Sequence, residues 1–221
     1  MGFEYLFQPS HLERLMFGLF ETIKISFISI FFAAILGAIF GIVMTSNNLI
    51  VRSICRIYLE SIRIIPILVW LFIFYFGFAT WFNWQLSSFS VCIVVFVMWG
   101  AAEMGDLVRA AISSIDKHQR DTSYALGMTQ WQTLYYIVLP QSLKRVTPGS
   151  INLFTRMVQT SSLAVLIGVV DVIKVGQQLI ENSLLVVPNA SLWVYGFIFI
   201  LYFAICYPLS KLATYLEKIW E

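Results

Sequence analysis

Long runs without charge alternate with short polar segments along this chain. The apolar runs cover residues 25–51, 58–77, 88–112, 151–170 and 192–209. The first run contains no ionisable residue and is longer than the roughly 20 residues that a helix needs to cross a hydrocarbon core. Apolar and charged positions interleave over residues 1–22, which we expect to lie along the membrane interface. The pattern predicts an all-α integral membrane protein with about five transmembrane helices, in a single transmembrane domain spanning residues 1–221.

Two local features refine this picture. Ala33, Gly37 and Gly41 recur at every fourth position of the first run and predict a face that packs closely against another helix. Pro66 lies inside the second run, where it is expected to kink the helix. Residues 171–188, between the last two runs, are expected to form a polar external segment.

The stretch at residues 113–148 is too polar to cross a bilayer and is expected to fold as short helices outside it. Asp116 is suited to cap a first helix, and Gly127 to end that helix in the left-handed conformation. Thr129, with Gln132 three residues later, is suited to begin a second helix, and Pro140 to mark the return to the membrane. The apolar residues of this protrusion would offer a contact surface to a soluble protein. They are Ala125, Leu126, Trp131, Leu134 and Tyr135.

Composition supports the membrane assignment, because 59% of the residues are hydrophobic and only 12% are charged. The net charge of +2 gives no indication of a nucleic-acid partner. Cys55, Cys92 and Cys206 are far apart in sequence, and the chain has only two histidines, so no metal site is predicted.

Charged residues inside the apolar runs are the candidates for chemistry. Glu103, Asp106 and Arg109 follow one another at three-residue spacing in the third run, and Arg156 lies early in the fourth. Because charge is costly inside a membrane, we expect Arg156 to pair with Glu103 or Asp106. A second pair is expected between Glu60 and Arg63. Such charges would serve either to hold helices together or to contact a substrate.

The polar stretch resembles the loop that permeases of binding-protein-dependent ABC importers insert into their ATPase subunits. That family pattern reads Glu-Ala-Ala, then Gly, then a segment ending in Ile, Leu and Pro. The matching positions here are Asp121, Thr122, Ser123, Gly127, Ile137, Leu139 and Pro140, with Asp, Thr and Ser in place of Glu-Ala-Ala.

Three further segments resemble the permeases for polar amino acids of the histidine, glutamine, glutamate, arginine and cystine type. The matching residues are Tyr58, Glu60, Arg63 and Pro66 in the second run, Asp106 and Arg109 in the third, and Gln159, Thr160, Ser161, Ser162 and Leu163 in the fourth. Ile64 and Ile65 stand where this family usually has Gly and Thr, and Gln159 and Thr160 where it has Lys and Asp.

The resemblance implies the type I ABC importer (MetI-like) permease fold and a subunit that translocates polar amino acids. It implies as partners ABC ATPase subunits, a second permease chain that is identical or homologous, an extracytoplasmic solute-binding protein, membrane lipid and the amino-acid substrate. The implied coupling residues are Asp121, Thr122, Ser123, Ala125, Leu126, Gly127, Leu139 and Pro140. The residues suggested for the substrate pathway are Glu60, Arg63, Pro66, Glu103, Asp106, Arg156, Gln159, Thr160, Ser161 and Ser162.

The chain has no P-loop pattern, so it is predicted to be a transport subunit rather than an enzyme, with no bound cofactor of its own. ATP and Mg would be bound by the partner ATPase.

The positions of basic residues predict the orientation in the bacterial cytoplasmic (inner) membrane. One side of a five-span arrangement carries Arg52, Arg56, Arg109, Lys117, Arg120, Lys144, Arg145, Lys211 and Lys218, and the other Arg14, Lys24 and Lys174. By the positive-inside rule the first side is cytoplasmic, which leaves the N-terminus external and the C-terminus cytoplasmic.

Other functions are less well supported. A passive channel or an ion-coupled carrier would use Glu103, Asp106 and Arg156 as a relay, yet no internal repeat of the kind common in carriers is present. A membrane scaffold would not need charged residues within its spans, and an intramembrane enzyme would need a catalytic set that the spans do not suggest.

Overall fold

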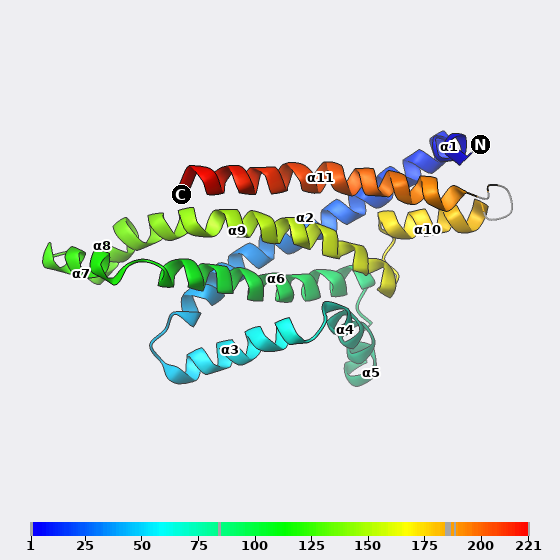
Figure 1. Cartoon of the computed structure of the whole chain (residues 1–221). Coiled ribbons are helices and arrows are strands. Elements are labelled where there is room, and N and C mark those ends of the chain that lie inside the picture. The colour runs from blue at the N-terminus through cyan, green and yellow to red at the C-terminus, as the bar shows by residue number, and fades with distance from the viewer. Residues whose placement is uncertain (1, 84, 184–186, 188, 221) are drawn as a thin grey trace. The chain divides into compact units, whose positions relative to one another are not determined.

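The computed structural model describes residues 2–83, 85–183, 187 and 189–220, and the regular elements in this part of the chain are all helical (Figure 1). They are α1 (Gly2–Leu6), α2 (Pro9–Met44), α3 (Leu49–Ile64), α4 (Ile67–Phe72), η1 (Ile73–Gly77), α5 (Phe78–Phe82), α6 (Ser88–Ser113), α7 (Lys117–Ala125), α8 (Gln130–Thr133), η2 (Leu134–Val138), α9 (Leu139–Thr160), η3 (Ser161–Ile167), α10 (Val172–Ser183) and α11 (Ala190–Trp220). Among the described residues, α2, α6 and α11 are long and apolar enough to cross a membrane, and five spans result if two broken helix pairs count as one each. This confirms the predicted all-α fold with about five transmembrane helices.

The chain folds into two compact units. The first comprises Met1–Ile30, Pro66–Phe96 and Thr155–Pro208, and the second comprises Phe31–Ile65, Val97–Phe154 and Leu209–Glu221. Helices α2, α6, α9 and α11 each contribute a segment to both units. The single domain over residues 1–221 stays a prediction.

Two buried apolar clusters fill the first unit. One gathers Ile25, Leu71, Val91, Cys92, Val95, Phe96, Ala164, Ile167 and Val169. The other gathers Leu6, Leu15, Leu19, Val172, Val175, Leu179, Val194 and Ile198. The second cluster draws on α1, α2, α10 and α11, so these helices are held together by apolar packing.

Helix α10 is more apolar than the polar segment expected at 171–188, whose external position stays a prediction. Val172, Val175 and Leu179 recur with helical spacing and therefore form one apolar face of the helix. All three side chains are buried. Asp171 begins the helix, since its Oδ1 accepts the N–H of Lys174 at 2.8 Å. Residues 184–186 and 188 of the expected segment lie outside the described part of the chain.

The second unit contains the close helix crossing predicted from the small residues of α2. A Cβ added to Gly41 would lie 2.6 Å from the carbonyl oxygen of Gly105 on α6, and Ala33 is fully buried. The two helices therefore approach at backbone distance, which a larger side chain would prevent.

Several predicted boundaries were wrong. Helix α2 begins at Pro9 rather than at residue 25 and ends at Met44 rather than at 51. A new helix begins shortly after this end, because the Asn48 side chain accepts the N–H of Ile50 at 2.9 Å and caps α3. Helix α3 therefore starts at Leu49, well before residue 58, where the second apolar run was expected to begin. The interfacial position of residues 1–22 stays a prediction.

The kink expected at Pro66 is a complete break between α3 and α4. Ile65 is in an extended conformation, with φ −83° and ψ 123°, as favoured for a residue that precedes proline.

Candidate functional site

Helices α7 and α8 form a protruding pair in the second unit, with the caps that the sequence predicts. The Asp116 carboxylate accepts the N–H of His118 at 2.9 Å, and Gly127 follows α7 with φ +79°. Thr129 caps α8 in a reciprocal capping box with Gln132. Because glycine adopts a positive φ without steric cost, Gly127 sets the reversal between the two helices.

A buried hydroxyl pair fastens α7 to α8. The Ser123 and Thr133 hydroxyl oxygens lie 2.8 Å apart, and both residues are almost fully buried. Ser123, one of the expected coupling residues, thus lies inside the pair rather than on its surface. Sequence inspection missed Thr133, which has no motif around it.

The outer surface of the pair is apolar and open. Leu126 is 77% exposed, Trp131 is 80% exposed and Tyr135 is 66% exposed. Of the remaining predicted coupling residues, Asp121, Thr122, Ala125 and Pro140 are exposed and Leu139 is partly buried. Tyr136, which was not predicted, is as exposed as Tyr135. We call Leu126, Trp131, Tyr135 and Tyr136 the loop face.

The second short helix expected after Gly127 does not end at Pro140. From α8 the backbone passes through the π-helical turn η2 directly into α9, of which Pro140 is the second residue. Proline cannot donate the usual helical hydrogen bond and clashes with the preceding turn of a regular helix, so the wider turn before it relieves the conflict. The pair is consequently continuous with the part of α9 that belongs to the second unit.

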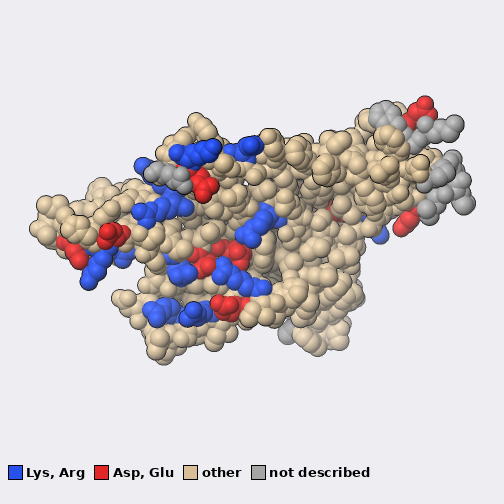
Figure 2. Space-filling view, in the orientation of Figure 1, with Lys and Arg blue, Asp and Glu red and all other residues tan. Residues whose placement is uncertain are grey.

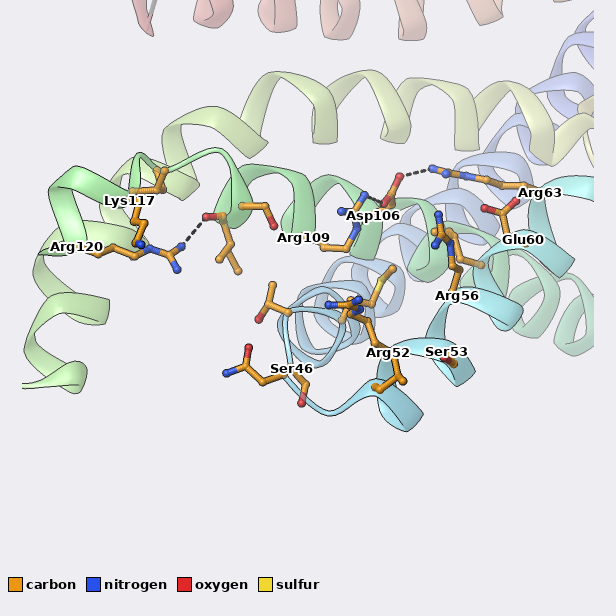
Figure 3. Close-up of a pocket in the computed structure, with 18 residues that line it drawn as sticks. Ser46, Arg52, Ser53, Arg56, Glu60, Arg63, Asp106, Arg109, Lys117 and Arg120 are labelled. Atoms are coloured by element: carbon orange, nitrogen blue, oxygen red, sulfur yellow. Dashed lines mark hydrogen bonds and ion pairs between the residues drawn. The ribbon is translucent and has the colours of Figure 1, made fainter.

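An ion cluster in the second unit joins α3 to α6 (Figure 3). Arg63 Nε donates to Glu103 Oε1 at 2.9 Å, and Arg63 Nη2 donates to Asp106 Oδ2 at 2.7 Å. Arg109 Nε donates to the other Asp106 oxygen, Oδ1, at 2.9 Å. The predicted ion pair of Arg63 with Glu60 was wrong, because the Arg63 guanidinium pairs instead with the two carboxylates on α6. The cluster thus brings two guanidinium groups and two carboxylates into contact.

The other residues suggested for the substrate pathway belong to the first unit. They are Pro66, Arg156, Gln159, Thr160, Ser161 and Ser162. The hydroxyl of Ser161 donates to the Val158 carbonyl and that of Ser162 to the Gln159 carbonyl, so both hydroxyls bond back to the last turn of α9. The pairing of Arg156 with Glu103 or Asp106 stays a prediction.

A cavity of about 860 Å³ adjoins the ion cluster within the second unit. Its charged lining consists of Arg52, Arg56, Arg63, Arg109, Lys117 and Arg120 against Glu60 and Asp106. Lys and Arg side chains also gather over α3 and α6 in the space-filling view (Figure 2). From the sequence, most of these cations were used only to predict the orientation in the membrane. Their spacing along the chain does not show that they line one cavity.

Residues 33–218 match the family described as binding-protein-dependent transport system inner membrane component. The L-cystine transport system permease protein TcyB of Bacillus subtilis is 30% identical over 213 residues, which cover 96% of this chain and 89% of that protein.

Solved structures share the fold. A chain of an amino acid ABC transporter, crystallised with histidines, superimposes with a TM-score of 0.85 at 24% identity and 95% coverage of both chains. A chain of the MetNI methionine ABC transporter, in an inward-facing conformation, superimposes with a TM-score of 0.69 at 18% identity over 95% of this chain and 99% of that one. The predicted MetI-like fold is confirmed.

Proposed function

The chain belongs to the family of binding-protein-dependent transport system inner membrane components, and we propose that it is the membrane-spanning permease of an ATP-driven importer of polar amino acids. Its partners in this proposal are ABC ATPase subunits, a second permease chain and an extracytoplasmic solute-binding protein. ATP and Mg would be bound by the ATPase, and this chain would hold no cofactor. The cystine-transport relative and the fold shared with an amino acid transporter support the substrate class.

The observation that carries the proposal is the loop face. Large apolar and aromatic side chains left open on a polar protrusion are typical of a surface that a protein partner covers. Since the pair runs without a break into α9, movement of a docked ATPase would be transmitted along that helix. The internal bonds of the pair, from Ser123 to Thr133 and across the capping box, make it rigid enough for that task.

The distribution of basic residues supports the orientation in which the loop face is cytoplasmic. All the cations that the sequence placed on the cytoplasmic side belong to the second unit, whereas Arg14, Lys24 and Lys174 belong to the first. The N-terminus is then external and the C-terminus cytoplasmic.

For the substrate route we favour the polar run Gln159–Ser162 over the ion cluster. The carboxylates of Glu103 and Asp106 already bind Arg63, so they serve first to hold α3 against α6. A passing amino acid would have to break that cluster, whereas Gln159 keeps an exposed amide side chain.

Copurification tests this function. We expect a tagged chain, extracted from membranes in detergent, to bring down a P-loop ATPase. Trp131→Ala should release the ATPase, with affinity lowered by roughly 30-fold or more, because a central aromatic anchor typically contributes about 2 kcal/mol or more.

The matched control is Ile42→Ala, which also truncates an exposed apolar residue but on α2. It should leave the ATPase bound. A chain recovered alone in its wild-type form, while conducting solutes passively, would instead support a channel or carrier.

A further inference from the structure

Helix α3 has three lengthwise stripes of different character. Cys55, Leu59 and Ile62 are buried. Beside them runs a charged stripe with helical spacing, formed by Arg52, Arg56, Glu60 and Arg63. The third stripe is exposed and apolar, formed by Ile50, Ile54, Ile57 and Ile64. A helix that shows an isoleucine stripe next to a cationic one suits a membrane interface, where acyl chains and headgroups meet.

The cavity beside the charged stripe retains excess positive charge. Arg63 and Arg109 are matched by the carboxylates that they bind, whereas Arg52, Arg56, Lys117 and Arg120 face only Glu60 among the remaining acidic lining residues. Figure 3 shows Arg52 and Arg56 projecting from α3 and Lys117 and Arg120 approaching from α7.

A backbone bond holds Arg120 in the lining of this cavity, because its Nη2 donates to the Ile112 carbonyl at 2.9 Å. A carbonyl carries no full negative charge, so this bond leaves the positive charge of Arg120 available to an anion.

An apolar groove adjoins the cationic cavity. The groove has a volume of about 660 Å³ and shares Ser53, Arg56 and Glu60 with the cavity. From there it follows Ile57, Ile64 and Ile65 along the exposed isoleucine stripe. The two spaces together offer a place for a charged head and an apolar tail.

We propose that this double site binds an anionic glycerophospholipid, with its phosphate in the cavity and one acyl chain in the groove. Guanidinium groups bind phosphate through charge-assisted hydrogen bonds, and basic pockets at the cytoplasmic ends of membrane helices suit anionic headgroups. A water-soluble phosphate would match the cations but leave the isoleucine groove empty. The site does not depend on which solute the protein carries.

Native mass spectrometry tests the proposal on the chain purified with whatever subunits accompany it. After delipidation, the protein is offered phosphatidylglycerol and phosphatidylcholine in equal amounts. We expect preferential retention of phosphatidylglycerol, and a loss of at least about tenfold in Arg52→Gln/Arg56→Gln. The control Lys144→Gln/Lys218→Gln removes the same charge outside the cavity and should retain the lipid.

A second variant tests the groove and distinguishes lipid from free phosphate. Ile57→Ser/Ile64→Ser should weaken phosphatidylglycerol retention severalfold while leaving the cations in place. The proposal is overturned if the wild type shows no preference, as it would if a partner subunit covered the cavity. It is equally overturned if the arginine variant matches its control, if the isoleucine variant retains lipid fully, or if glycerol phosphate competes as well as the lipid.

Discussion

Each of the two units of this protein packs apolar side chains inside it, but charged groups play a larger part in the second unit. Apolar packing dominates the first unit, where Leu15, Val172 and Leu179 are fully buried. The second unit contains ten of the fourteen Lys and Arg residues, and Arg63 joins α3 to α6 by ion pairs there. The protruding helix pair and the cationic cavity also belong to the second unit.

The contrast separates a unit that rests mainly on apolar packing from one that also carries the loop face and the ion cluster. Apolar packing does not depend on the pairing of charges, so the first unit holds its shape chiefly through burial of apolar surface. Ion pairs with partly exposed partners are weaker and exchangeable, which suits the proposed role of this unit in responding to an ATPase.

The largest effect should come from the first unit. Leu179→Ala removes a fully buried side chain and should lower the free energy of unfolding by about 3 kcal/mol. Leu166→Ala, at a side chain that is 48% exposed in the same unit, should cost far less. The stability of both variants is compared by heating them and following the loss of the folded peak in size-exclusion chromatography. Equal destabilisation of the two variants would contradict the conclusion that buried apolar packing stabilises this unit.

In the second unit, Asp106→Leu should be somewhat milder, at about 2 kcal/mol. The substitution leaves Arg63 with one carboxylate and removes the acceptor of Arg109, but partial exposure lets water compensate. The same thermal assay applies, with Asp106→Asn expected to fall between Asp106→Leu and the wild type. A loss as large as that in Leu179→Ala would mean that ion pairs and apolar packing matter equally in the two units.

Coupling through the helix pair should depend on the backbone at Gly127. Gly127→Val should strain the turn by about 1–2 kcal/mol and reduce ATPase attachment, whereas Gly127→Asn should retain it, because Asn tolerates a positive φ. A Cβ at this position meets nothing within 4 Å, so crowding does not contribute. Copurification measures attachment, and equal behaviour of the two variants would contradict the role of the turn.

The smallest effect should come from Glu103→Gln. Arg63 keeps its bond to Asp106, so the cost should stay below about 1 kcal/mol, with assembly and uptake both retained. Uptake of labelled amino acid by vesicles is the measurement. If uptake disappears while the complex still assembles, Glu103 contacts substrate and the ion cluster is part of the route.

Features that arise within a few residues could be predicted from the sequence. The caps at Asp116 and Thr129, the reversal at Gly127 and the interruption at Pro66 all follow from local backbone chemistry. The spacing of small residues in α2 likewise indicated the crossing with α6.

Features that depend on tertiary contacts were missed. The pairing of Arg63 with Glu103 spans 40 residues, and local spacing favoured Glu60 instead. Helix α10 was expected to be a polar segment, because its polar residues concealed the apolar face that packs in the core. The cavity could not be predicted either, because its cations come from three separate helices, α3, α6 and α7, which only the tertiary fold brings together.

The most direct test of the importer account is the ATPase rate of the purified complex in vesicles. The rate is measured with and without a polar amino acid and its solute-binding protein, for the wild type and for Trp131→Ala. The account predicts a substrate-stimulated rate in the wild type and no stimulation in the variant. Full stimulation in Trp131→Ala, or a wild-type rate that ignores amino acids, would contradict it.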